Sequence, residues 1–180
     1  DAMVLLAQAL GQFPQARPST VAIVTTSGGG GAITADRLTD LGIPLARFEP
    51  ETAARLGLLY PDNVAGSNPI DMGAAREGGS MLVGSDTLGA VLRDPGTDIV
   101  LSAITTAPDV RLLCEKFIEG TRSAEAEGHA RPHIVVMQPG HAGDAARELL
   151  RREGAIYTDS LDDAIRAIEA WSRMADLRVR

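Results

Sequence analysis

The stretch VAIVTTSGGGG at residues 21–31 decides the fold class. Its first five residues are apolar or β-branched and do not alternate with polar residues, which is typical of a strand buried on both faces in a parallel sheet. Four glycines follow after two further residues, Thr26 and Ser27. The sequence AITADRLTDLG at residues 32–42 has helical spacing and ends on a glycine, a common helix terminator. We interpret the stretch as a buried strand that turns directly into a helix.

The same order of strands and helices continues along the chain. We predict four further strands at residues 44–48, 98–104, 133–137 and 155–157, helices at residues 4–10, 50–59, 80–93, 108–127, 142–153 and 161–174, and a long loop at residues 60–79. Strands separated by single helices require right-handed crossovers, which place helices on both faces of a parallel sheet. The sequence therefore predicts a three-layer, flavodoxin-like α/β fold with five parallel strands in the order 2-1-3-4-5.

Composition restricts the classes of function. Of the 180 residues, 44% are hydrophobic and 23% are charged, which is enough apolar content for a core. No apolar run approaches the roughly 18 residues of a membrane span. The formal net charge of −7 argues against a general nucleic-acid binder. Neither nucleic acid nor a membrane is therefore an expected partner, and because no export signal is evident we expect a cytoplasmic location.

The predicted organisation is one domain with short extensions. Residues 1–17 are expected to be a helix and linker from a preceding domain, residues 18–175 the α/β domain, and residues 176–180 a tail. The chain starts Asp-Ala-Met and enters a helical pattern at once, so we expect a segment of a longer polypeptide. The single cysteine, Cys114, lies on the apolar face of a predicted helix, where we expect it to be buried, and excludes a disulfide framework. Trp171 is expected to pack in the core.

The residues best suited to bind an anion follow the strands. In an open α/β sheet, ligands bind beyond the carboxyl ends of the strands. The segment Ser27, Gly28, Gly29, Gly30 and Gly31 combines main-chain amides that a ligand can approach with a helix N-terminus, which favours negative charge. Because GxGxxG spacing and a Walker-A lysine are both missing, NAD and P-loop nucleotide binding are not indicated. A tight turn that binds nothing is the alternative.

Two further segments are predicted near the same edge. Thr105, Thr106 and Ala107 follow the third strand and offer hydroxyls and amides before a helix, which Asp109 is expected to cap. The loop at residues 60–79 contains Asn68-Pro69-Ile70-Asp71, a polar turn in a connection long enough to line a site.

His141 is the histidine predicted to lie at this edge. It could carry a phosphoryl group or act as a base, although we favour a solvent-facing position in the first turn of a helix. His129 and His133 are expected to be surface groups. Three scattered histidines without paired carboxylates indicate no metal site.

A known family shares four segments with this sequence in the same order and spacing: VAIVTTSGGGGAITADRLTDLGIPLARF, GSNPIDMGA, VLRDPGTDIVLSAI and ARELLRREGAIYTDSLDDAIRAIEA. Together they cover nearly the whole chain, residues 18–172. The chain resembles the last CoA-ligase domain of NDP-forming acyl-CoA synthetases. The C-terminal domain of the succinyl-CoA synthetase β-subunit is a more distant relative.

The resemblance implies a role for this domain within a larger enzyme. Such enzymes join an acid, CoA and a nucleoside triphosphate through an acyl phosphate and a phosphohistidine. The domain is expected to bind no cofactor itself, whereas CoA and ATP or ADP with Mg²⁺ bind in the full enzyme. Its expected partners are the CoA-binding, phosphohistidine and ATP-grasp domains or subunits of the same synthetase. It would supply half of the phosphohistidine and acyl-phosphate site and be inactive in isolation.

The resemblance also implies which residues bind phosphate or substrate. They are Ser27, Gly28, Gly29, Gly30, Gly31, Asn68, Asp71, Thr105, Thr106 and Ala107. The sequence Gly-His-Ala-Gly around His141 looks like the phosphohistidine motif of the partner subunit. Its place after the fourth strand matches the non-catalytic pattern of this domain, so His141 is only a candidate catalytic residue.

Two alternatives stay open. Where the succinyl-type domain has a pair of glycines, this chain has Thr106-Ala107-Pro108, and proline lacks an amide donor. That difference favours a non-catalytic docking or regulatory module of a multidomain CoA-ligase-like or acetyltransferase fusion protein. An FMN-binding flavodoxin has the same topology, but an aromatic content of 3% supplies few rings to hold a flavin.

Overall fold

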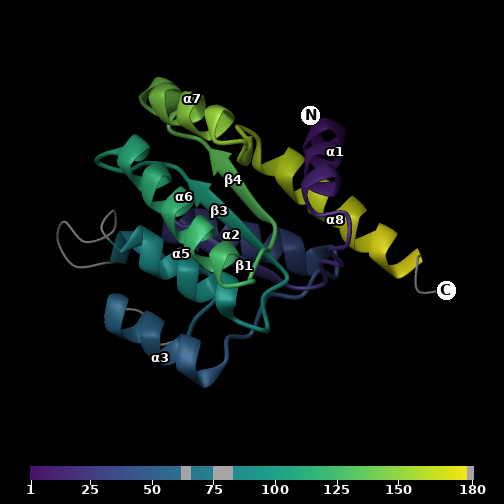
Figure 1. Cartoon of the computed structure of the whole chain (residues 1–180), viewed down its shortest axis with the longest axis horizontal. Coiled ribbons are helices and arrows are strands. Elements are labelled where there is room, and N and C mark those ends of the chain that lie inside the picture. Colours follow the sequence, from purple (N-terminus) through teal and green to yellow (C-terminus); the bar gives the residue numbers. More distant parts are fainter. Residues whose placement is uncertain (62–65, 75–82, 178–180) are drawn as a thin grey trace.

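The computed structural model describes residues 1–61, 66–74 and 83–177 (Figure 1). Its sheet consists of β1 (Val21–Thr25), β2 (Ile70–Asp71), β3 (Ile99–Ile104), β4 (His133–Met137) and β5 (Ile156–Thr158), in the order β2-β1-β3-β4-β5. Every neighbouring pair of these strands is parallel. The predicted fold class and strand order are therefore confirmed.

The helices cover both faces of the sheet (Figure 1). One face carries α1 (Ala2–Gln12), α2 (Gly28–Asp40) and α8 (Leu161–Leu177), and the other carries α3 (Pro50–Leu59), α5 (Gly84–Arg93), α6 (Val110–Ala126) and α7 (Asp144–Arg152). Each face of the sheet has its own apolar core. Along β1, Val21 and Ile23 belong to the core under α1, α2 and α8, whereas Ala22 and Val24 belong to the core under α3, α5, α6 and α7. Successive side chains of a strand point to opposite faces, so one fully apolar strand supports two cores.

Two predicted core residues are buried. Cys114 on α6 has no exposed surface, and burial raises the pKa of its thiol to about 12, so it is a packing residue and not a reactive thiol. The side chain of Trp171 on α8 is 2% exposed and packs in the core shared with α1. Within the described ranges, no helix combines the length and the apolar character needed to cross a membrane.

The second strand lies elsewhere than predicted. Residues 44–48 form only an isolated bridge between Leu45 and Val21, and β2 is a two-residue strand at Ile70–Asp71, inside the segment predicted as a loop. The 44–46 segment lies beside the start of β1, and β2 pairs with the last two residues of β1. The position at the edge of the sheet that we assigned to one strand is therefore filled by two short segments, one after the other along β1.

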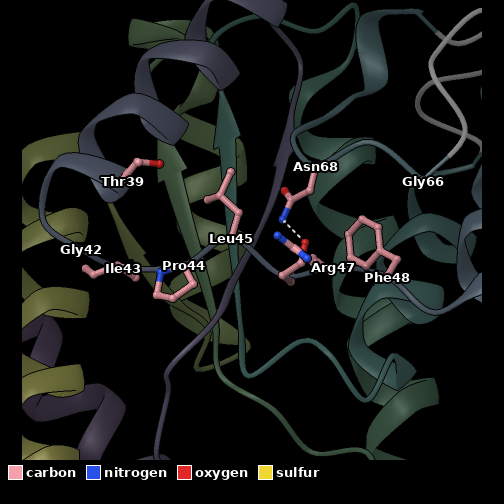
Figure 2. Close-up of a pocket in the computed structure, with 10 residues that line it drawn as sticks. Thr39, Gly42, Ile43, Pro44, Leu45, Arg47, Phe48, Gly66 and Asn68 are labelled. Atoms are coloured by element: carbon pink, nitrogen blue, oxygen red, sulfur yellow. Dashed lines mark hydrogen bonds between the residues drawn. The ribbon is translucent and has the colours of Figure 1, made fainter.

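Asn68 joins these two segments to β1. Its carboxamide oxygen accepts a hydrogen bond from the main-chain nitrogen of Ile23 (2.9 Å), and its nitrogen donates to the carbonyl oxygens of Val21 (2.9 Å) and Ala46 (3.0 Å). Figure 2 shows the carboxamide turned toward the 44–48 segment. The side chain takes the place of a main-chain peptide group at the sheet edge, where main-chain groups need partners. The carboxamide of Asn68 therefore serves the hydrogen bonding of the sheet edge.

Helix α2 begins at Gly28, four residues before the predicted start. The Ser27 hydroxyl caps the helix by accepting a hydrogen bond from the nitrogen of Gly30 (3.2 Å). A Cβ on Gly31 would lie 2.9 Å from Cγ2 of Thr25 and 3.1 Å from Cβ of Pro69. The glycines therefore form the first helical turn, and at Gly31 a larger residue would collide with Thr25 and Pro69.

The C-terminal elements differ from the prediction at their ends. Residues 140–143 form a short 3-10 helix, η2, so α7 starts at Asp144. Helix α8 continues to Leu177, and the first residues of the predicted tail are therefore helical. The predicted start of α5 at residue 80 and residues 178–180 of the tail lie outside the described residues.

His133 is half-buried and has specific partners, so the prediction that it is a plain surface group is wrong. Its ring packs edge-on against Phe117, with 5.7 Å between the ring centroids, and its Nε2 atom lies 2.8 Å from the hydroxyl of the fully buried Ser102. Burial lowers the pKa of His133 to about 4, because the charged imidazolium would lose its hydration. His133 is the first residue of β4, and α6 covers that end of the strand.

This histidine should make stability depend on pH. The folded protein keeps His133 neutral, whereas the unfolded chain takes up its proton near the ordinary pKa of 6.5. The unfolded state therefore binds more protons between pH 6.5 and 4, and stability should fall as the pH falls through that window. The full shift would correspond to about 2–3 kcal/mol between about pH 7 and pH 4.5, and because the side chain is half-buried we expect a loss of about 1–2 kcal/mol. Urea unfolding of the protein and of His133→Gln at several pH values in this range measures the loss. If the free energy of unfolding depended on pH equally in both proteins, the expectation would be contradicted.

Candidate functional site

The predicted site segments lie at the carboxyl ends of neighbouring strands. β1 leads through Thr26 and Ser27 into α2, β3 leads into Thr105, and β2 ends at Asp71. Because all of these strands are parallel, their carboxyl ends meet at one edge of the sheet. A Cβ on Gly28 would lie 2.8 Å from a carboxylate oxygen of Asp71, and one on Gly30 would lie 3.7 Å from Cγ2 of Thr105. Asp71 and Thr105 are therefore both packed against the first turn of α2.

Thr26 ties two of these segments together. Its hydroxyl oxygen accepts hydrogen bonds from the main-chain nitrogens of Thr105 (3.1 Å) and Thr106 (3.4 Å), and it lies 3.4 Å from the hydroxyl oxygen of Thr105. The sequence placed Thr26 at the start of the Gly-rich segment but did not predict its bridging role, because a side chain that joins two strand ends leaves no periodic signal. The amides of Thr105 and Thr106, which we predicted to contact phosphate, are thus held by this hydroxyl.

The amides at the start of α2 are differently placed. The nitrogens of Gly30 and Gly31 are bonded to Ser27, through its hydroxyl (3.2 Å) and its carbonyl oxygen (2.9 Å). Within the described part of the chain, the N–H groups of Gly28 and Gly29 have no hydrogen-bond acceptor, and both residues are exposed. Two open amides at a helix N-terminus form an arrangement that suits an anion.

The start of α6 is less suited to an anion. As predicted, Asp109 caps this helix: its carboxylate accepts a hydrogen bond from the nitrogen of Leu112 (2.9 Å). Pro108 has no amide hydrogen, and Ala107 is half-buried. A carboxylate lies beside both helix ends, Asp109 at α6 and Asp71 next to Gly28 of α2, so the difference in favour of α2 is its two open amides.

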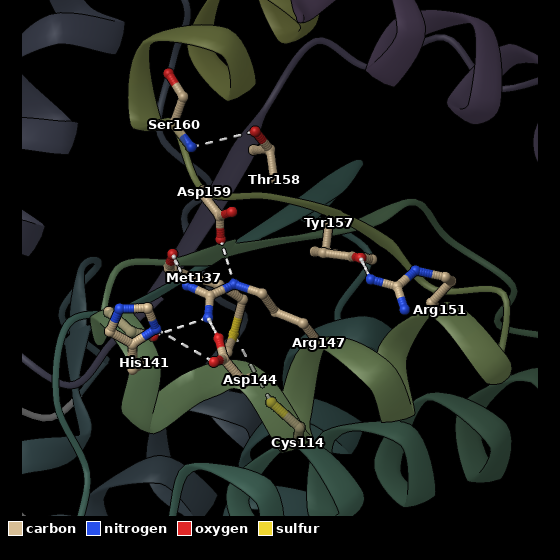
Figure 3. Close-up of polar contacts among 11 residues, drawn as sticks. Cys114, Met137, His141, Asp144, Arg147, Arg151, Tyr157, Thr158, Asp159 and Ser160 are labelled. Atoms are coloured by element: carbon tan, nitrogen blue, oxygen red, sulfur yellow. Dashed lines mark hydrogen bonds and ion pairs between the residues drawn. The ribbon is translucent and has the colours of Figure 1, made fainter.

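The end of β4 carries a cluster of charged residues that surround Arg147 (Figure 3). The Arg147 guanidinium contacts Asp144 (2.8 Å), Asp159 (2.7 Å) and the carbonyl oxygen of Gly140 (2.8 Å), and so fixes the turn of η2. His141 on this turn is fully exposed, and its Nδ1 atom lies 3.3 Å from a carboxylate oxygen of Asp144. This placement agrees with the solvent-facing position that we favoured.

A pocket beside the sheet edge lies away from the candidate site. Its volume is about 660 Å³, and it follows the sheet edge beside residues 42–48 and Asn68, next to the start of β1 and not its end (Figure 2). Among the described residues, no group of three or more His, Cys, Asp or Glu side chains could hold a metal ion. The open amides of α2 are therefore the feature with ligand-binding chemistry at the predicted edge.

This fold and its open helix end define the class of the domain, which is a flavodoxin-like parallel α/β domain. The chain is homologous to the alpha subunit of ADP-forming acetate–CoA ligase, and the predicted family resemblance is thereby confirmed. No protein-family model matches the sequence.

Two relatives with known activities match the chain. It is 28% identical over 176 residues to the alpha subunit of ADP-forming acetate–CoA ligase II from Pyrococcus furiosus, covering 97% of this chain and 38% of the relative. It is 29% identical over 157 residues to ADP-forming acetate–CoA ligase I from Archaeoglobus fulgidus, covering 87% of this chain and 21% of the relative. The chain thus spans less than half of each relative.

Solved structures share the fold. The protein PH0766 from Pyrococcus horikoshii OT3 superposes with a TM-score of 0.80 at 27% identity, over 97% of this chain and 40% of that one. The dinucleotide-forming acetyl-coenzyme A synthetase 1 from Ca. Korarchaeum cryptofilum superposes with a TM-score of 0.78 at 19% identity, over 99% of this chain and 39% of that one. It has been solved without ligand and with phosphate and ADP.

Proposed function

We propose that this chain is a domain of an ADP-forming acyl–CoA ligase, in which it forms one wall of the phosphohistidine and acyl-phosphate site. The single observation that carries the proposal is the pair of open amides at Gly28 and Gly29, at the carboxyl edge of the sheet. Homology to ADP-forming acetate–CoA ligases supports it. The remaining walls would come from the CoA-binding, phosphohistidine and ATP-grasp domains or subunits, with CoA and nucleotide bound there.

The chemistry of this edge fits such a role. A phosphoryl group in transfer carries negative charge that fixed amide dipoles stabilise without becoming nucleophiles themselves. Ser27 and Thr26 bond to neighbouring main-chain groups and so hold the loops that surround Gly28 and Gly29. Asp71 lies beside Gly28, so the anion would contact α2 on the side away from this carboxylate. The domain supplies preorganised donors, and the attacking group would come from a partner.

Gly29→Pro tests the proposal directly. The substitution removes one open N–H, and the first turn of a helix accepts proline because that N–H has no partner within the helix. Inorganic phosphate and acetyl phosphate, titrated separately into the ¹⁵N-labelled chain, should shift the amide signals of Gly28 and Gly29. Gly29→Pro should weaken this binding about tenfold, since one hydrogen bond to a charged group is lost.

Gly29→Ala is the matched control. No atom lies within 4 Å of a Cβ at this position, and alanine keeps the amide. It should bind phosphate as the parent protein does. If neither anion shifts Gly28 or Gly29, or if Gly29→Pro binds as tightly as Gly29→Ala, the proposed phosphate role is wrong.

A second candidate is a docking or regulatory module with no phosphate contact. The observation that favours it is the engagement of the Thr105 and Thr106 amides by Thr26, together with the Asp109 cap on α6. The same titration separates the two candidates. If no amide signal at this edge of the sheet shifts, the docking module is supported. Saturable shifts confined to Gly28 and Gly29 support the ligase domain.

A further inference from the structure

A second pocket lies at the opposite edge of the sheet, where β4 and β5 begin. Its volume is about 120 Å³, and its wall is largely apolar, with Phe117, Ile118, Val135, Leu150 and Ile156 among its residues. Thr121 and His133 also line it. An apolar cavity of about 150 Å³ is large enough to hold benzene, so this pocket suits a molecule of similar or slightly smaller size.

The contacts around His133 favour one of its neutral tautomers. The hydroxyl of Thr121 donates to the carbonyl oxygen of Phe117 (2.9 Å), so toward the ring Thr121 can only accept. The Nδ1 atom of His133 lies 3.5 Å from that hydroxyl oxygen, and a proton on Nδ1 is the arrangement that gives both ring nitrogens a partner. Nε2 then accepts from the hydroxyl of Ser102 (2.8 Å).

The resulting Nδ1–H is a poorly used donor. A separation of 3.5 Å is at the limit for a hydrogen bond, whereas a good N–H···O bond measures about 2.9 Å. Both Thr121 and His133 line the pocket. A ligand oxygen in the pocket could therefore accept a hydrogen bond from this N–H at a shorter distance than Thr121 does.

The charges around the pocket cancel. Arg122, Arg131, Glu125 and Glu153 belong to its lining, and Arg122 is paired with Glu153 at 2.5 Å. Two positive and two negative side chains leave no net attraction for an ionic ligand, and desolvating an ion in an apolar pocket is unfavourable. An uncharged ligand is therefore favoured.

We propose that this pocket is a second binding site, which takes a small uncharged molecule with an apolar body and one hydrogen-bond acceptor, such as a carbonyl oxygen. The acceptor would bond to Nδ1–H of His133, and the apolar body would lie against Phe117, Leu150 and Ile156. The site is at the edge of the sheet opposite to Gly28 and Gly29, and it does not depend on the proposed phosphate role.

Cyclopentanone is a suitable probe, because it combines a compact apolar ring with one carbonyl oxygen. Titrated into the methyl-labelled chain, it should shift the signals of Ile118, Leu150 and Ile156 in a saturable way. We expect a dissociation constant on the order of 1–10 mM, as suits a ligand of about six heavy atoms. Without saturable shifts at these three residues, the proposal is overturned.

Three variants and one spectroscopic measurement sharpen the test. Ala155→Leu should fill the pocket and abolish binding, whereas Ala145→Leu, on the exposed face of α7, should leave it unchanged. His133→Phe keeps a ring but loses the donor and should weaken binding about fivefold. Long-range ¹H–¹⁵N correlation on the parent protein should place the imidazole proton on Nδ1. A proton on Nε2, or unchanged binding by a folded Ala155→Leu variant, would refute the proposal.

Discussion

Gly120→Leu is expected to lower the free energy of unfolding by about 3 kcal/mol, which is the largest effect that we predict for a single substitution. Helices α5 and α6 cross at this glycine. A Cβ on Gly120 would lie 2.6 Å from the carbonyl oxygen of Ser85 and 3.3 Å from the main-chain nitrogen of Gly89. Both neighbours are main-chain atoms of α5, which cannot move away by a change of rotamer, so the helices would have to separate.

The control for this prediction is Gly11→Leu, which places the same side chain in open space. Gly11 is exposed near the end of α1, and no atom lies within 4 Å of a Cβ there. Leucine has a higher helix propensity than glycine, so this variant should be equal to the parent or more stable by up to about 1 kcal/mol. Urea unfolding followed by circular dichroism measures both. Equal stabilities for the two variants would mean that α5 and α6 are not in close contact at Gly120.

The overall topology could be predicted because its signals are local and repeated. β1, β3 and β4 are apolar runs without alternation, and each is followed by a helical pattern of its own, which together define a parallel sheet. β2 could not be predicted in the same way. A two-residue strand has no period, and its partner in the edge position, Leu45, makes only one bridge.

Two errors of prediction come from tertiary contacts that override local preference. Glycine is a poor helix former, so the sequence favoured a turn at residues 28–31, yet these residues begin α2, and at Gly31 the close contacts with Thr25 and Pro69 leave no room for a larger residue. His133 is polar and starts a strand, which suggested exposure. Its position is instead decided by Phe117 of α6 and by Ser102 of the neighbouring strand, neither of which is adjacent in sequence.

The sequence was sufficient to predict where the candidate site lies, but not which of its amides are available to a ligand. The rule that ligands bind beyond the carboxyl ends of parallel strands led to the right edge of the sheet for Gly28, Asp71 and Thr105. Which amides are open was not predictable, because that depends on the Thr26 hydroxyl and on the Ser27 cap. Such bonds depend on side-chain rotamers and on loops that meet only in the fold.

Asn68→Ala should lower the free energy of unfolding by about 2 kcal/mol and leave phosphate-induced shifts at Gly28 and Gly29 intact. The resemblance to acyl-CoA synthetases implied a binding role for Asn68, whereas its carboxamide bonds to the main chain of Ile23, Val21 and Ala46. Alanine leaves one N–H and two carbonyl groups at the sheet edge without these partners. Hydrogen exchange at the Ile23 amide should accelerate along with the loss of stability.

Two further variants show whether Asn68 acts through the sheet or through a ligand. Asn68→Asp keeps the acceptor for the Ile23 amide but places a carboxylate oxygen against the carbonyl groups of Val21 and Ala46, so it should be no more stable than Asn68→Ala. Ser67→Ala changes the neighbouring residue and should have little effect. If Asn68→Ala instead kept full stability and lost the phosphate-induced shifts, Asn68 would be a ligand-binding residue, and its hydrogen bonds to the sheet edge would contribute little to folding.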